Sequence, residues 1–221
     1  MYFIPITMKK PIIATTLSGL FVKHAPWDRA HQLWYKRASR ILRDSSLIKR
    51  GKRKEGYFTS VDEIMKRIYP ELSEKERTKI AREMYFDIVL KYIKHRPHVK
   101  NERVIKYFKS LKSKYKIALI TTNTPEAARK ILHIAHLDKL FDLVETSPPS
   151  EKDDKRKVFD RFIAKHGKPI LYMGGNRKDS FEYCREHGIR GIFANFENSK
   201  AILGAKSVRN LNELKEIIHK L

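Results

Sequence analysis

The sequence predicts an α/β fold in which a parallel sheet is covered by helices on both faces and carries an all-helical insertion after its first strand. Three observations lead to this prediction. A short apolar strand, Pro11 to Thr15, precedes a long stretch, residues 23–96, that contains only helical patterns. From residue 97 onward, short apolar segments alternate with amphipathic helical segments. This alternation favours a parallel sheet, because parallel neighbours are joined by crossover helices.

The predicted insertion contains three helical patterns separated by turns. The first pattern, Trp27 to Leu47, repeats apolar residues at the spacing of one helix face. Each of the other two begins with a capping box, in which a glutamate follows a serine by three residues. These are Ser60 with Glu63, opening a helix to Tyr69, and Ser73 with Glu76, opening a helix to Ile93.

The remaining elements alternate as a covered parallel sheet requires. Apolar runs predict strands and amphipathic stretches predict helices. The predicted strands are residues 117–122, 141–145, 169–173 and 191–194; the predicted helices are residues 104–111, 125–135, 155–165, 179–187 and 211–221.

Composition excludes several classes of protein. Hydrophobic residues make up 41% of the 221 residues, which argues against a disordered chain. A single cysteine, Cys184, excludes an internal disulfide framework and a cysteine-rich metal site. Apolar runs such as residues 117–120 are too short to span a bilayer. The apolar residues 1–8 precede Lys9 and Lys10, the reverse of a signal peptide, so we expect a cytoplasmic protein without membrane insertion.

The charge indicates affinity for polyanions. The chain has 48 Lys and Arg against 25 Asp and Glu, a formal net charge of +23. The densest basic run is Lys49, Arg50, Lys52, Arg53 and Lys54, and it lies beside Tyr57 and Phe58. Basic residues next to aromatic ones suit nucleic-acid binding. The same run is typical of a solvated loop, which is the interpretation we favour.

Polar residues follow four of the predicted strands. Because the carboxyl ends of parallel strands meet at one edge of the sheet, these residues form the candidate site. Hydroxyl groups and helix N-termini at this edge favour an anion, although Thr and Asn are also ordinary helix caps. The candidate ligand-binding residues are Thr16, Ser18, Thr122, Asn123, Lys152, Lys155, Gly175 and Asn176.

Two segments carry a resemblance to a known family. Residues 116–142, KIALITTNTPEAARKILHIAHLDKLFD, are similar to the second motif of the haloacid dehalogenase-like (HAD-like) superfamily of phosphatases and related hydrolases. Residues 170–194, ILYMGGNRKDSFEYCREHGIRGIFA, resemble its fourth motif. The resemblance implies a three-layer, Rossmann-like core built from residues 1–22 and 97–221, with a helical cap at residues 23–96.

The chain departs from this family where the chemistry takes place. Thr16 and Ser18 stand at the positions of the nucleophilic and the acid/base aspartate, and Gly175 stands at that of a magnesium-binding aspartate. The second-motif hydroxyl is present as Thr122, and Asp179 remains as the one predicted metal ligand. The third-motif lysine has two foremost candidates, Lys152 and Lys155.

These departures predict binding without the chemistry of the family. That chemistry needs one carboxylate to attack phosphorus, a second to protonate the leaving group, and carboxylates to hold Mg²⁺. We therefore expect a pseudophosphatase that binds a phosphate-bearing or other anionic ligand, with no catalytic residue assigned and no cofactor. Two alternatives stay open. One is an active HAD-type phosphoester hydrolase with an atypical site and Mg²⁺; the other is a basic nucleic-acid-binding protein.

Overall fold

The computed structural model describes residues 10–53 and 57–221, and the sheet formed by these residues has six strands. Their order is β3-β2-β1-β4-β5-β6, and every neighbouring pair is parallel. The α/β fold class is therefore confirmed. The strands are β1 (Ile12–Thr15), β2 (Lys116–Ile120), β3 (Leu143–Glu145), β4 (Leu171–Gly174), β5 (Arg190–Ala194) and β6 (Lys206–Val208).

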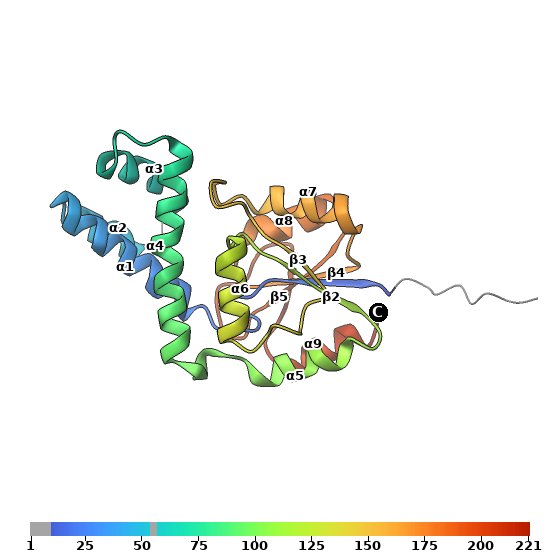
Figure 1. Cartoon of the computed structure of the whole chain (residues 1–221). Helices are drawn as coiled ribbons and strands as arrows, with labels where there is room; N and C mark the ends of the chain where they lie inside the picture. Colours follow the sequence, from blue (N-terminus) through green and yellow to red (C-terminus); the bar gives the residue numbers. More distant parts are fainter. Residues whose placement is uncertain (1–9, 54–56) are drawn as a thin grey trace, which may run out of the picture.

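Helices cover both faces of the sheet, as Figure 1 shows. One face packs against α7 (Lys155–His166) and α8 (Lys178–Glu186), and the other against α5 (Glu102–Leu111), α6 (Pro125–Ile134) and α9 (Leu211–Ile218). The alternation of side chains along a strand produces the two cores. In β2, Ile117 and Leu119 belong to one core and Ala118 and Ile120 to the other.

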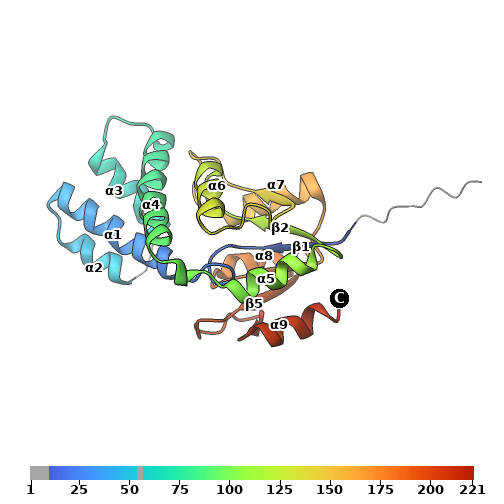
Figure 2. The same cartoon turned by 60° about the horizontal axis from the view of Figure 1, so that its bottom comes forward.

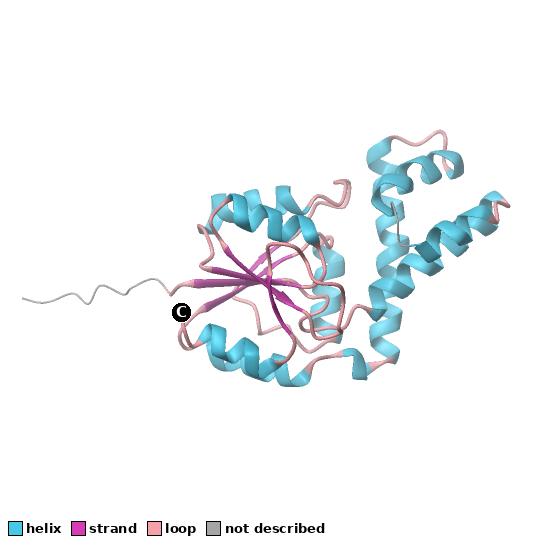
Figure 3. Cartoon of the chain, turned by 180° about the vertical axis from the view of Figure 1, so that it is seen from behind, coloured by secondary structure: helices cyan, strands magenta, loops and turns pink. Residues whose placement is uncertain are grey.

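The insertion after β1 consists, in its described residues, of helices joined by turns. It consists of α1 (Ala25–Leu42), α2 (Ser46–Arg53), α3 (Tyr57–Ile68) and α4 (Glu74–His95), which we call the helical block. Figures 2 and 3 show it beside the sheet, at the end where the carboxyl ends of the strands lie. The block has a buried cluster of its own, formed by Trp34, Tyr35, Ala38, Leu47, Ile64, Met65 and Ala81.

The two connections between the helical block and the sheet run side by side. A bridge pairs Val22 with Lys100, and the backbone N–H of Lys23 donates to the carbonyl of Val99 at 2.9 Å. The returning chain passes through a short 3-10 helix, η1 (Pro97–Val99), before α5. These contacts fasten the base of the block next to the loop that follows β1.

The single helix predicted for Trp27 to Leu47 is wrong, because the chain breaks there into α1 and α2. Arg43 adopts a left-handed conformation with φ of 51° and ends α1. The Asp44 carboxylate then accepts a hydrogen bond from the backbone N–H of Ser46, at 3.1 Å, where α2 begins. Apolar spacing continues across such a three-residue turn, so periodicity did not reveal it.

The loop interpretation of the basic run is also wrong. Residues 49–53 lie in α2, where Leu47 is buried and Gly51 packs closely on the side chain of Tyr35. The guanidinium of Arg50 donates to the hydroxyl of Ser60 at 2.6 Å. Lys54 lies outside the described residues.

The two predicted capping boxes have different outcomes. The box of Ser73 and Glu76 is confirmed at the start of α4. The box of Ser60 and Glu63 is wrong: α3 begins at Tyr57, and Ser60 lies inside the helix as the buried acceptor for Arg50. Strand β6 was not predicted, since its three residues, two of them polar, form no apolar run.

None of the helices in residues 10–53 and 57–221 combines the length and the apolar character that a membrane span requires.

Candidate functional site

A cavity of about 660 Å³ lies between the helical block and the ends of strands β1, β2 and β4. Its walls are the loops after these strands together with residues of α1, α3 and α4. Every ligand or metal residue predicted from the sequence lines this cavity: Thr16, Ser18, Thr122, Asn123, Lys152, Lys155, Gly175, Asn176 and Asp179. The sheet brings them together because its parallel strands end at one edge. Their role in binding stays a prediction.

Lys155, rather than Lys152, is the lysine of the cavity interior. It begins α7, its side chain is buried, and its ammonium donates to the carbonyl of Ile120 at the end of β2. Burial lowers the pKa of Lys155 to about 7, and the positive charge of Arg177 acts in the same direction. Lys152 is largely exposed and pairs with Glu74 of α4 at 2.6 Å.

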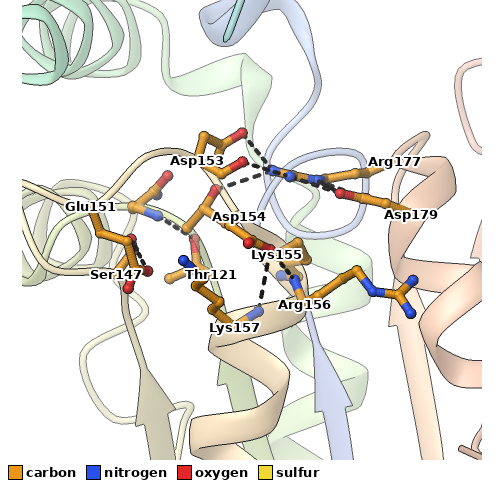
Figure 4. A network of polar contacts seen from close by, with 12 residues as sticks. Thr121, Ser147, Glu151, Asp153, Asp154, Lys155, Arg156, Lys157, Arg177 and Asp179 are labelled. Carbon is orange, nitrogen blue, oxygen red and sulfur yellow. Dashed lines mark hydrogen bonds and ion pairs between the residues drawn. The ribbon is translucent and has the colours of Figure 1, made fainter. Parts of the chain in front are cut away.

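Arg177 is the charged centre of the loop after β4. Its guanidinium donates to Asp179 at 2.8 Å and to Asp153 at 2.7 Å, and it also reaches the hydroxyl oxygen of Thr122 at 3.3 Å. Figure 4 shows the arginine between the two carboxylates. Burial works to lower the pKa of Arg177, but Asp153 and Asp179 outweigh it and hold this pKa above its ordinary value. The guanidinium is therefore a fixed positive charge.

His24 fills the space beside Gly175. A β carbon on Gly175 would lie 2.8 Å from Nε2 of His24 and 2.5 Å from the carbonyl oxygen of Ser18. The imidazole is held there by Glu197, whose Oε1 lies 2.8 Å from Nδ1 and also accepts from the backbone N–H of His24 at 3.0 Å. Only a glycine fits at position 175 without displacing these groups. Gly19, with φ of 77°, lies against the same imidazole.

The hydroxyl residues of the cavity have different surroundings. The N-cap of α6 is Thr124, whose side chain accepts from the backbone N–H of Ala127, so Thr122 and Asn123 are not its cap. The hydroxyl oxygen of Thr122 accepts from Arg177 instead. Within residues 10–53 and 57–221, neither Thr16 nor Ser18 has a hydroxyl hydrogen-bonded to a basic side chain. In the described part of the chain, no side chain accepts a hydrogen bond from either hydroxyl group, so neither is activated by a hydrogen-bonded general base in this arrangement.

Arg82 joins the helical block to the loops of the sheet. From α4 it donates to the carbonyl of Pro148 and the hydroxyl of Ser147, both at 3.2 Å, and to the carbonyls of Thr122 and Glu151. One guanidinium thus connects the loops after β2 and β3 to the helical block. These loops carry candidate ligand residues, so Arg82 helps to set the shape of the cavity.

Replacing Arg82 with methionine is expected to loosen this connection. Hydrogen bonds from a charged donor are each worth about 1.5–3 kcal/mol, so we expect a loss of about 1–3 kcal/mol in the free energy of unfolding. Amide hydrogen exchange in residues 147–152 should become faster. Lys79→Met, at an exposed position of the same helix, is the matched control. Equal exchange in the two variants would contradict the proposed connection.

Comparison with known proteins identifies the fold. No protein-family model and no curated protein sequence matches the chain. Among solved structures, the HAD phosphatase from Thermococcus onnurineus is similar with a TM-score of 0.60, 18% identity, and coverage of 94% of this chain and 97% of that one. CbbY from Rhodobacter sphaeroides in complex with phosphate is similar with a TM-score of 0.59 and 11% identity. The match covers 93% of this chain and 96% of CbbY. Magnesium-bound YfnB from Bacillus subtilis, a HAD-hydrolase, is similar with a TM-score of 0.58 and 12% identity. The match covers 96% of this chain and 99% of YfnB.

The chain has a haloacid dehalogenase-like fold. Identities of 11–18% establish the HAD-like fold and leave the activity to be argued from the site. At that site, the three positions that the resemblance assigns to carboxylates hold a threonine, a serine and a glycine.

The side chains of this site differ from those of a usual magnesium site. Mg²⁺ needs oxygen ligands in octahedral geometry and is usually bound through one or two carboxylates. Position 175 carries no side chain, and both carboxylate oxygens of Asp179 accept hydrogen bonds from Arg177. Within the described part of the chain, no group of three or more His, Cys, Asp or Glu side chains is placed to hold a metal.

Several residues of the site were missed by the sequence reasoning. Arg177 lies between the predicted residues Asn176 and Asp179 in the loop after β4, so its position in the sequence could have indicated that it belongs to the site. His24, Glu197 and Arg82 gave none, since they reach the site from the connection after β1, the loop after β5 and the helical block. Asp153 lies next to the lysine candidates but matched no motif.

Proposed function

We propose that this protein is a pseudophosphatase: it binds a phosphate-bearing or otherwise anionic ligand in the cavity without the aspartyl-phosphate chemistry of HAD-type enzymes. The observation that carries the proposal is one cavity that combines a buried lysine, Lys155, with Thr16, Ser18 and Gly175 at the three carboxylate positions. The buried lysine supports anion binding, and the residues at the three carboxylate positions argue against the reaction.

The residues at positions 16 and 18 are the reason why we expect no aspartyl-phosphate chemistry. A threonine hydroxyl without a neighbouring base is a poor nucleophile, whereas a carboxylate attacks phosphorus in its ordinary charge state. A serine at position 18 cannot replace a carboxylic acid in protonating a leaving group, a step worth roughly 10²–10⁴-fold in rate. Asp179 is the carboxylate left in the fourth motif, and Arg177 engages both of its oxygens.

The anion would bind at the sheet end of the cavity. Lys155 supplies an ammonium group there, and the loop of Thr122 and Asn123 leads into the N-terminus of α6. Helix N-termini present backbone N–H groups and a positive partial charge, which favour an anion. An anion bound near Lys155 would also stabilise its charged form, which burial disfavours.

The opposite side of the cavity belongs to the helical block, and it combines aromatic side chains with polar ones such as Asp28 and His31. Trp27, Tyr85 and Phe86 line it from α1 and α4. We propose that residues 23–96 act as a cap domain over a core of residues 1–22 and 97–221. The ligand would then carry an apolar or aromatic body against the cap and its anionic group against the core. A volume of about 660 Å³ lies within the range of about 300–1,000 Å³ that is usual for small-molecule sites.

The proposal is tested by measuring binding and turnover on the same protein. Titration calorimetry with sulfate, inorganic phosphate and an aryl phosphate should detect binding, and the affinity should be equal with magnesium and with a chelator. The same preparation should not hydrolyse the aryl phosphate or a panel of phosphometabolites. Magnesium-dependent turnover that Asp179→Asn abolishes would establish the active-hydrolase alternative and overturn the proposal.

The nucleic-acid alternative stays an untested prediction. It rests on the net charge of +23 and on the basic residues of α2, of which Arg50 is engaged with Ser60 inside the helical block. Binding of RNA or DNA that weakens steeply with salt would support it.

A further inference from the structure

The guanidinium of Arg177 lies where the loops after β2, β3 and β4 meet, at the edge of the cavity. We propose that this guanidinium is the permanent cation of the site and makes a divalent metal unnecessary. The inference rests on the proposed function in treating the cavity as an anion site, but its test uses no anion.

The geometry places one positive group between two carboxylates from different loops. Arg177 donates to both oxygens of Asp179, at 2.8 and 3.0 Å from Nε, and to Oδ2 of Asp153 at 2.7 Å. A second terminal nitrogen reaches the carbonyl oxygen of Asp153 at 3.3 Å. Together with the hydroxyl oxygen of Thr122, these are hard oxygen donors of the kind that Mg²⁺ prefers. In this chain they surround a guanidinium.

A second observation shows that the arrangement extends beyond one side chain. The space next to position 175 is taken by His24, which Glu197 holds through its ring and its backbone N–H. A carboxylate at position 175 would collide with that imidazole and with the carbonyl of Ser18. Arg177 therefore occupies the carboxylate oxygens of Asp153 and Asp179. On the other side of the site, His24 fills the space that a carboxylate ligand at position 175 would need.

The chemical consequence is that the guanidinium offsets one of the two negative charges of Asp153 and Asp179 without a metal ion. Arginine stays protonated in proteins, so the charge is present at every physiological pH and metal concentration. A guanidinium also has no coordination site to activate water, whereas a bound metal ion would supply one. The substitution thus suits a site that holds an anion rather than one that cleaves it.

Removing the guanidinium should turn the two carboxylates into a metal site. The probe is Mn²⁺ alone, measured by the electron paramagnetic resonance signal of the free ion and by the shift in melting temperature. We expect Arg177→Gln and Arg177→Ala to bind Mn²⁺ about tenfold or more tightly than wild type, since two carboxylates suffice for weak binding. Arg177→Lys keeps a positive charge and should behave as wild type. Arg177→Gln combined with Asp179→Asn should lose the gain.

Two results would overturn the inference. The first is tight binding of Mn²⁺ by wild type that disappears in Asp179→Asn; this comparison does not depend on whether the Arg177 variants fold. The second is a folded Arg177 variant, judged by circular dichroism and cooperative unfolding, with no gain in Mn²⁺ affinity. Failure of the proposed function is distinguishable, because it would be seen as missing anion binding in calorimetry while the Mn²⁺ results stay as expected.

Discussion

Replacing Lys155 with methionine is expected to weaken binding of sulfate by about tenfold or more, since a hydrogen bond between charged groups is worth roughly 1.5–3 kcal/mol. The ammonium is the buried cation at the sheet end of the cavity, and methionine keeps most of its volume without its charge. Sulfate is the suitable probe because its own charge does not change near neutral pH. The measurement is titration calorimetry on both proteins.

Lys157→Met is the matched control for this experiment. Lys157 lies two residues further along α7, and its side chain is exposed. Its loss removes the same formal charge from the protein but leaves the cavity unchanged. If the two variants lost affinity equally, general charge and not the buried lysine would account for binding.

The affinity of wild type for sulfate should also depend on pH. Burial lowers the pKa of Lys155 to about 7, so the side chain becomes neutral as pH rises above 7. An anion favours the charged form, so binding is expected to weaken above pH 7, approaching about tenfold per pH unit for one linked proton. Lys155→Met should lack this dependence. A wild-type affinity that stays flat from pH 6 to 9 would contradict the role of Lys155.

The same pKa determines how Lys155 affects stability. In the unfolded chain, the side chain of Lys155 stays protonated up to its ordinary pKa of 10.5. In the folded chain it loses its proton near pH 7. Between these values the unfolded state binds more protons, so the contribution of Lys155 to stability rises with pH. The advantage in stability of Lys155→Met over wild type should therefore be full below pH 7 and shrink toward pH 10. Urea unfolding of the two proteins at several pH values measures this difference.

A second large effect is expected for Gly175→Asp, which restores the carboxylate that the HAD family resemblance assigns to this position. A β carbon there would lie 2.5 Å from the carbonyl oxygen of Ser18, a backbone atom that cannot move alone. Overpacking of this kind costs about 1–3 kcal/mol, so the melting temperature should fall. The variant should also show no magnesium-dependent phosphatase activity, even combined with Thr16→Asp and Ser18→Asp.

Two further variants separate the causes. Gly175→Ala adds the β carbon without the carboxylate, so it measures the collision alone. In a His24→Ala background, Gly175→Asp should cost less than in wild type, because one of the two colliding groups is gone. Unchanged stability of Gly175→Asp would contradict the close packing of this loop. Robust activity of the triple variant would show that the metal position can be reopened by carboxylates alone.

Much of the fold could be predicted because its signals are local. The apolar runs of β1 to β5 and the amphipathic helices between them involve neighbours within a few residues, and each of these strands lies within two residues of its predicted bounds. The capping box of Ser73 and Glu76 is another such signal. Strand β6 and the turn at Arg43 were missed because a three-residue polar strand and a single left-handed residue leave no period to detect.

The position of the candidate site also followed from the sequence. Parallel strands must end at one edge, so Thr16, Thr122, Lys155 and Gly175 were expected to meet there, and they line one cavity. The threonine, serine and glycine at the positions that the resemblance assigns to carboxylates are likewise visible in the sequence. The sequence did not reveal which lysine is buried at the cavity, because Lys152 and Lys155 differ in their surroundings and not in residue type.

The sequence by itself therefore determined the layers, the helical insertion and the loops that form the site. Only the tertiary structure decided what surrounds those loops: Arg82 contacts Ser147 across 65 positions, and Glu197 holds His24 across 173. The physical reason is the separation along the chain of the residues that interact. Periodicity and capping report contacts within one or two helical turns, whereas an ion pair or a filled cavity depends on segments that meet only after the sheet has formed.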